Sequence, residues 1–79
     1  MNRTELLDRL QDVFRRILGK PALMLNETTT AEDIPEWTSL THVQLINEIE
    51  DTMKVHFSVR EMMGWQNVGE IMDSIEAKQ

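Results

Sequence analysis

Three stretches of this 79-residue chain repeat apolar residues at intervals of three and four, the period of one face of an α-helix. The first stretch runs from about residue 3 to residue 18 and ends before Gly19 and Pro21, residues typical of a helix end. Its apolar positions are Leu6, Leu7, Leu10, Val13, Phe14, Ile17 and Leu18. Because helices of this length gain most of their stability by burying such a stripe, the pattern predicts an all-α protein.

Two further helices follow from the same spacing. The second is expected from Ser39 to Met53 and the last from Val68 to about Lys78. The inward positions of the second are Leu40, Val43, Ile46, Ile49 and Met53, with Leu45 widening the face, and those of the last are Val68, Ile71, Met72 and Ile75. Between them, Ser58 and Glu61 have the spacing of a capping box and predict one very short helix that ends at Gly64.

A long connection, residues 19–38, separates the first two helices. It contains Pro21 and Pro35, and Thr30 is placed to begin a single helical turn. Leu23, Met24 and Leu25 are too apolar for a free linker and are expected to pack against the helices. The predicted architecture is a small antiparallel four-helix bundle with three main helices, one short third helix and a long first loop, in a single domain spanning residues 1–79.

The charge balance indicates which partners to expect. A net charge of −6 disfavours nucleic acid, whose phosphates require clustered basic residues, and favours partners with basic surfaces. The chain has no cysteine, its N-terminus lacks the layout of a signal peptide, and no apolar run is long enough to span a membrane. A cytoplasmic monomer is therefore expected.

Ser39, at the junction of the long connection and the second helix, has two interpretations. A serine before a helix is a preferred N-cap, worth about 1 kcal/mol. Thr38 could serve as the cap equally well, so capping alone does not require Ser39. A phosphate ester on the Ser39 hydroxyl would instead lie where the amides and dipole of the helix favour an anion.

Catalysis by the chain's own side chains is not expected. His42 and His56 stand fourteen positions apart, and neither has a carboxylate or nucleophile partner evident in sequence, so both are interpreted as surface or rim histidines. No cluster has the spacing of metal ligands, and no glycine-rich phosphate loop is present. The sequence therefore predicts neither an enzyme nor a metal site.

The run from Trp37 to Ile46, followed by Glu48-Ile49-Glu50, resembles the second-helix region of acyl carrier proteins. That family shows an Asp-Ser-Leu triplet, apolar residues at helical spacing and a group of acids, and the resemblance extends along nearly the whole chain. It implies that Ser39 carries a 4′-phosphopantetheine arm derived from coenzyme A, whose thiol holds acyl groups as thioesters. The implied partners are a phosphopantetheinyl transferase and acyl-transferring, condensing or ligase enzymes with basic surfaces. The implied setting is a fatty-acid-like or specialised biosynthetic pathway.

The resemblance also implies roles for two groups of residues. The partner-recognition face would comprise Leu40, Thr41, Gln44, Asn47, Glu48 and Asp51. A core that can open around an acyl chain would comprise Val43, Ile46, Phe57, Met62, Val68 and Met72.

One residue departs from the family pattern, because Thr38 stands where the aspartate before the serine is usual. This departure leaves alternatives open. The chain could be an unmodified, carrier-like helical interaction module, or a carrier of aminoacyl or peptidyl groups. An unrelated four-helix adaptor would share the same periodicities but would leave the placement of Ser39 to coincidence.

Overall fold

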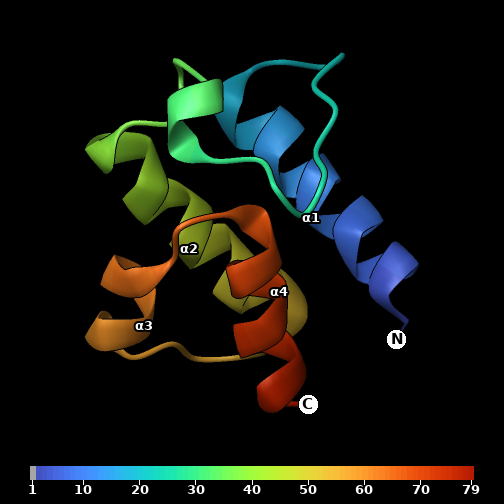
Figure 1. Ribbon diagram of the computed structural model, residues 1–79, viewed down its shortest axis with the longest axis vertical. Coiled ribbons are helices and arrows are strands. Elements are labelled where there is room, and N and C mark those ends of the chain that lie inside the picture. The colour runs from blue at the N-terminus through green and yellow to red at the C-terminus, as the bar shows by residue number, and fades with distance from the viewer. Residues whose placement is uncertain (1) are drawn as a thin grey trace.

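The computed structural model describes residues 2–79 and is all-helical over that range, which confirms the predicted fold class (Figure 1). Its elements are α1 (Arg3–Leu18), a 3-10 turn η1 (Ala31–Asp33), α2 (Ser39–Met53), α3 (Val59–Gly64) and α4 (Val68–Ala77). The long connection passes over one end of the bundle from α1 to α2, while α3 is the short helix beside α2. None of the described helices is long and apolar enough to cross a membrane.

A polar side chain caps the start of each of the four α-helices. Asn2, Thr38, Ser58 and Asn67 accept hydrogen bonds from the backbone N–H groups three residues further on. Such caps satisfy amides that lack intrahelical partners. The ends differ: α1 stops at Gly19 with φ of 67°, as expected, whereas α2 stops at Lys54 with φ of 57°. A left-handed lysine is an uncommon helix end that the sequence pattern did not indicate.

The hydrophobic core joins α1, α2 and α4. Its largest fully buried side chains include Phe14 of α1, Leu45 of α2 and Ile71 of α4, together with Phe57 from the segment before α3. Leu25, Ile34 and Trp37 bring the long connection into the same core. The other buried apolar residues are Leu6, Leu10, Val13, Leu18, Ile46, Ile49, Met53, Val68, Met72 and Ile75.

Three apolar residues expected to face inward are exposed instead. Leu40 and Val43 continue the inward stripe of α2 but are 72% and 56% exposed. Both lie toward the start of α2, and neither is among the residues of the core or packed against it. Met24 is also exposed, while Leu23 packs against the core and Leu25 is buried within it. The expected packing is therefore correct for Leu23 and Leu25 and wrong for Met24.

Backbone hydrogen bonds fasten the long connection to the first turn of α4. The amides of Val68 and Gly69 donate to the carbonyls of Thr29 and Glu27 over 2.9 and 2.8 Å. A Cβ on Gly69 would lie 3.0 Å from the Glu27 carbonyl oxygen, so the approach depends on the missing side chain. On the α1 side, Gln11 accepts from the Leu25 amide over 2.9 Å. These contacts set where the connection delivers the chain to α2.

Arg3 joins both ends of the chain to the long connection. Its guanidinium bonds Glu27 over 2.8 Å and also contacts the carboxylates of Asp73 and Glu76 on α4. The hydrogen bond from Arg3 lowers the pKa of Glu27 below its ordinary value of 4.5.

This ion-pair cluster predicts a specific response to acid. Because the folded pKa of Glu27 is depressed, its stabilising contribution is complete above pH 4.5 and is lost as the pH falls through the folded value. Arg3→Met should therefore be less stable than the wild type at pH 7, and the difference should shrink below pH 4.5, as measured by urea denaturation. Arg9→Met, which removes an α1 arginine without an ion pair among residues 2–79, is the control. A stability difference for Arg3→Met that persists undiminished at pH 3 would contradict this assignment.

Candidate functional site

The capping role at the start of α2 belongs to Thr38 and not to Ser39. The Thr38 hydroxyl accepts from the Thr41 amide over 3.3 Å, and the Thr41 hydroxyl accepts from the Thr38 amide over 2.7 Å. The Thr41 hydroxyl also donates to the Glu36 carbonyl over 2.8 Å. Ser39 is the first residue of the helix, its side chain is exposed, and its hydroxyl makes no hydrogen bond within residues 2–79. Its hydroxyl is therefore available for covalent attachment.

The surroundings of the Ser39 hydroxyl suit an anion. The first backbone bond of α2 runs from the His42 amide to the Thr38 carbonyl over 2.8 Å, so the amides of Ser39 and Leu40 precede the hydrogen-bond ladder. The first turn of α2 contains no acidic residue. Unpaired amides and the helix dipole both stabilise negative charge here, so the residues present fit a phosphate ester.

The exposed face of α2 begins directly beside Ser39. Leu40, Gln44, Asn47 and Asp51 recur at helical spacing and are all exposed. The other two residues of the predicted recognition face lie differently. Thr41 is half-buried and engaged in the cap, and half-buried Glu48 turns toward α1, with its carboxylate 3.5 Å from the guanidinium of Arg16.

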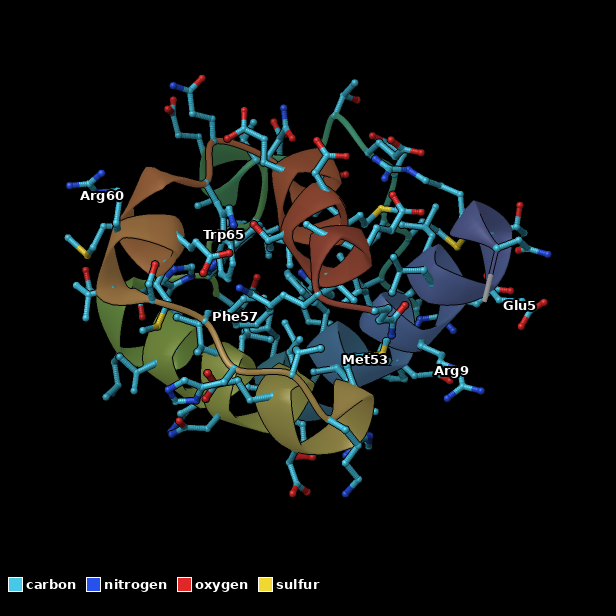
Figure 2. All side chains as sticks on the ribbon, turned by 90° about the horizontal axis from the view of Figure 1, so that it is seen from below. Glu5, Arg9, Met53, Phe57, Arg60 and Trp65 are labelled. Atoms are coloured by element: carbon cyan, nitrogen blue, oxygen red, sulfur yellow. The ribbon has the colours of Figure 1, made fainter. Side chains whose placement is uncertain are left out.

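A cavity of about 530 Å³ lies between α2, α3 and the segment that joins them. Buried Ile46 and Phe57 contribute to its lining with half-buried Met62, while exposed Val43 and Val59 stand at its outer side. Its polar lining residues are Asn47, Glu50, His56 and Ser58. Figure 2 shows Phe57 pointing into the interior between the helices, with Trp65 above it.

The six predicted core residues therefore divide into two groups. Val43, Ile46, Phe57 and Met62 line the cavity. Val68 and Met72 do not, because both are fully buried where α4 packs into the bundle. Both lie in the core as expected, and their role in an opening of that core around an acyl chain stays a prediction.

Glu50 is a cavity residue that the sequence analysis missed. Its carboxylate accepts from the Phe57 amide over 2.8 Å and lies 3.3 Å from Nδ1 of His56. The first contact fastens the segment that forms one wall of the cavity. Helical spacing could have found it, since Glu50 stands four residues after Ile46 and shares its face.

The two histidines have different environments. His56 is exposed, as expected of a surface residue. His42 is half-buried, and both of its ring nitrogens lie 3.0 Å from partners, the indole nitrogen of Trp37 and the carbonyl of Met62. The carboxylate partner that the sequence did not reveal belongs to His56, whose Nδ1 lies 3.3 Å from the Glu50 carboxylate, whereas the partners of His42 are an indole N–H and a backbone carbonyl. Within residues 2–79, no cluster of three or more histidine, aspartate or glutamate side chains could hold a metal ion.

Comparison with known proteins identifies the family. Residues 8–75 match the family described as the phosphopantetheine attachment site. An acyl carrier protein of Saccharopolyspora erythraea is 27% identical over 73 residues, which is 92% of this chain and 77% of that protein. The solution structure of holo acyl carrier protein from Geobacter metallireducens matches with a TM-score of 0.85 and 35% identity, over 91% of this chain and 83% of that one.

The family match and the similar fold place the chain in the class of phosphopantetheine-dependent carriers. This chain belongs to the acyl carrier protein family, which confirms the resemblance. It is a carrier and not a catalyst, and its cofactor is a covalently bound 4′-phosphopantetheine. Its family acts with phosphopantetheinyl transferases and biosynthetic enzymes.

The division of roles between Thr38 and Ser39 is testable by alanine substitution. Thr38→Ala should lower the free energy of unfolding by about 1 kcal/mol, because it removes the side-chain cap of α2. Ser39→Ala should change the free energy of unfolding by only about 0.2–0.3 kcal/mol, since the Ser39 hydroxyl makes no hydrogen bond within residues 2–79. Urea denaturation of the unmodified protein measures both. An equal loss in the two variants would show that Ser39 also stabilises the helix.

Proposed function

We propose that Ser39 is the residue that bears the 4′-phosphopantetheine arm. The observation that carries this proposal is an exposed hydroxyl at the first position of α2 that makes no hydrogen bond within residues 2–79. The amides of the same turn precede the backbone hydrogen bonds of the helix. When attached, the arm supplies a thiol that holds acyl groups as thioesters. The capping box of Thr38 and Thr41 fixes the first turn of α2, so the serine stands on a rigid support.

The cavity between α2 and α3 is the proposed shelter for an acyl chain. Apolar side chains from Ile46, Phe57 and Met62 offer it contact, and exposed Val43 and Val59 stand at its outer side. A cavity of about 530 Å³ is in the range of small-molecule sites. The polar groups of Asn47 and His56 at its lining would remain toward water.

Partner enzymes are proposed to dock on the exposed face of α2. Leu40 offers an apolar contact next to Ser39, Gln44 and Asn47 offer hydrogen bonds, and Asp51 offers a charge for basic surfaces. Thr41 and Glu48 contribute indirectly, by shaping the cap and by tying α2 to α1. The proposed partners are acyl-transferring, condensing or ligase enzymes. They would act on a single-domain cytoplasmic monomer in a fatty-acid-like or specialised pathway.

Thr38 supports a second candidate, an unmodified carrier-like interaction module. A threonine here removes the negative charge that usually stands beside the acceptor serine. The structure offers a reason for a threonine that is compatible with modification, because Thr38 caps α2 as an aspartate would. Aminoacyl or peptidyl cargo would use the same attachment site.

Attachment is tested by mass spectrometry after incubation with coenzyme A and a broad-specificity phosphopantetheinyl transferase. The wild type should gain one phosphopantetheine, and Ser39→Ala should gain none. Ser58→Ala, which alters a cap serine at the start of α3, should still be modified.

The second candidate makes the opposite prediction for the wild type. If the wild type gains no phosphopantetheine while Thr38→Asp does, the fold can be modified and only recognition by the transferase has been lost. If neither is modified under conditions that modify a control carrier, the hypothesis of an unmodified interaction module replaces the proposal.

The charge of the docking face is tested by reversal. Asp51→Lys should slow modification by the same transferase about tenfold at low salt, because it places a positive charge on the face that meets a basic partner. Asp8→Lys, which makes the same charge change at an exposed position of α1, is the matched control. Added salt should narrow the difference between the wild type and Asp51→Lys. Equal effects of the two reversals would show that only net charge matters.

A further inference from the structure

His42 connects three separate parts of the molecule. It stands in the first turn of α2, three residues after Ser39, and its side chain lies between Trp37 of the long connection and the last turn of α3. The imidazole stacks on the Trp37 indole with centroids 6.0 Å apart and meets the Trp65 indole edge-on at the same distance. A side chain that touches all three segments can transmit a change in one to the others.

The partners of His42 determine which ring nitrogen carries the proton. The Trp37 indole N–H can only donate, so Nδ1 of His42 must accept. The Met62 carbonyl can only accept, so Nε2 of His42 must donate. Both hydrogen bonds form together only in the neutral tautomer with its proton on Nε2. The two hydrogen bonds therefore run in one order: Trp37 donates to His42, and His42 donates to the Met62 carbonyl of α3.

α3 has few other attachments to the bundle. It has only six residues, and none of them is buried. Isolated helices of that length are unstable in water. Beyond its own capping box, α3 is held by the half-buried side chain of Met62, by the Glu61–Lys78 ion pair at 3.0 Å and by the hydrogen bond from His42. Phe57 and Trp65, which flank α3, also pack against the core, so the hydrogen bond from His42 is the contact that fixes the Met62 carbonyl itself.

Met62 has two roles at this contact. Its carbonyl accepts the hydrogen bond from His42, while its side chain lines the cavity between α2 and α3. Holding the carbonyl therefore also holds one wall of the cavity. On the other side of His42, Trp37 is anchored in turn, since its buried indole packs edge-on against Phe14 of α1 with ring centroids 4.9 Å apart.

We propose that His42 is a positioning residue that latches α3 to the first turn of α2 and so sets the width of the α2–α3 cavity. The latch consists of Trp37, His42 and the Met62 carbonyl. When it is closed, the cavity wall is held in place, and when it opens, α3 can move away and admit or release cargo. The statement about cargo rests on the proposed function, whereas the latch between the helices does not.

The latch is tested first on the unmodified protein by amide hydrogen exchange. His42→Phe keeps an aromatic ring between the two tryptophans but removes both hydrogen bonds. It should speed exchange of the α3 amides about five- to tenfold and leave α1 and α4 nearly unchanged. His42→Gln can still accept from Trp37 and donate to Met62, so it should restore part of the protection.

A matched control and a spectroscopic signature separate positioning from general stability. Ser74→Ala removes the 2.9 Å hydrogen bond that the indole N–H of Trp65 donates to the Ser74 hydroxyl. Amide exchange in the last turn of α3 should stay at the wild-type rate in this variant. The indole N–H resonance of Trp37 should shift in His42→Phe and not in Ser74→Ala. Unchanged α3 exchange in His42→Phe, or equal acceleration in all four helices, would overturn the proposal.

The effect on the cavity is tested with an octanoyl-phosphopantetheine arm loaded from octanoyl-coenzyme A. Loading should shift the methyl resonances of Ile46 and Met62 in the wild type, and the shifts should be at least about twofold smaller in His42→Phe because its cavity is no longer held in one width. Equal shifts would overturn the link to cargo. Failure to load would instead contradict the proposed attachment at Ser39 and leave the exchange result standing.

Discussion

Seventeen buried apolar residues form the core of this protein over residues 2–79, and none of them belongs to α3. Hydrophobic burial is the main stabilising term in small domains, so α1, α2 and α4 hold one another while α3 depends on local contacts. The difference in buried side chains between α3 and the other three helices bears on the site. Leu40 and Val43 near the start of α2 are exposed, and a cavity lies between α2 and α3.

The second feature of the site is a division of labour between adjacent residues. Thr38 satisfies the amide of Thr41, and the hydroxyl of Thr41 satisfies the amide of Thr38, so the helix start is stable without Ser39. A serine that had to cap the helix could not also bear a substituent without some loss of stability. Because the cap precedes it, Ser39 combines a rigid support with an accessible hydroxyl. The same first turn of α2 contains His42, whose Nε2 lies 3.0 Å from the Met62 carbonyl of α3.

Local sequence signals predicted most of the elements and the position of the candidate attachment site. The starts of α2, α3 and α4 follow from cap residues and apolar spacing, both of which act within a few residues. The same spacing could not tell that Leu40 and Val43 are exposed, because exposure depends on what lies opposite. Spacing placed Val68 and Met72 in the core, where both are fully buried, but could not tell that they do not line the cavity between α2 and α3. Glu48 stands on the predicted docking face, and spacing along α2 could not show that its carboxylate lies 3.5 Å from the guanidinium of Arg16 on α1.

The amino-acid sequence by itself determined the helices, the acidic character of the chain and the serine at the head of α2, since propensity, capping and charge are properties of neighbouring residues. The capping box of Thr38 and Thr41 is local too, but only the tertiary structure decided that His42 joins Trp37 to Met62. Trp37 and Met62 stand far apart in sequence, and the hydrogen bonds of one imidazole depend on atoms that packing alone brings within 3.0 Å.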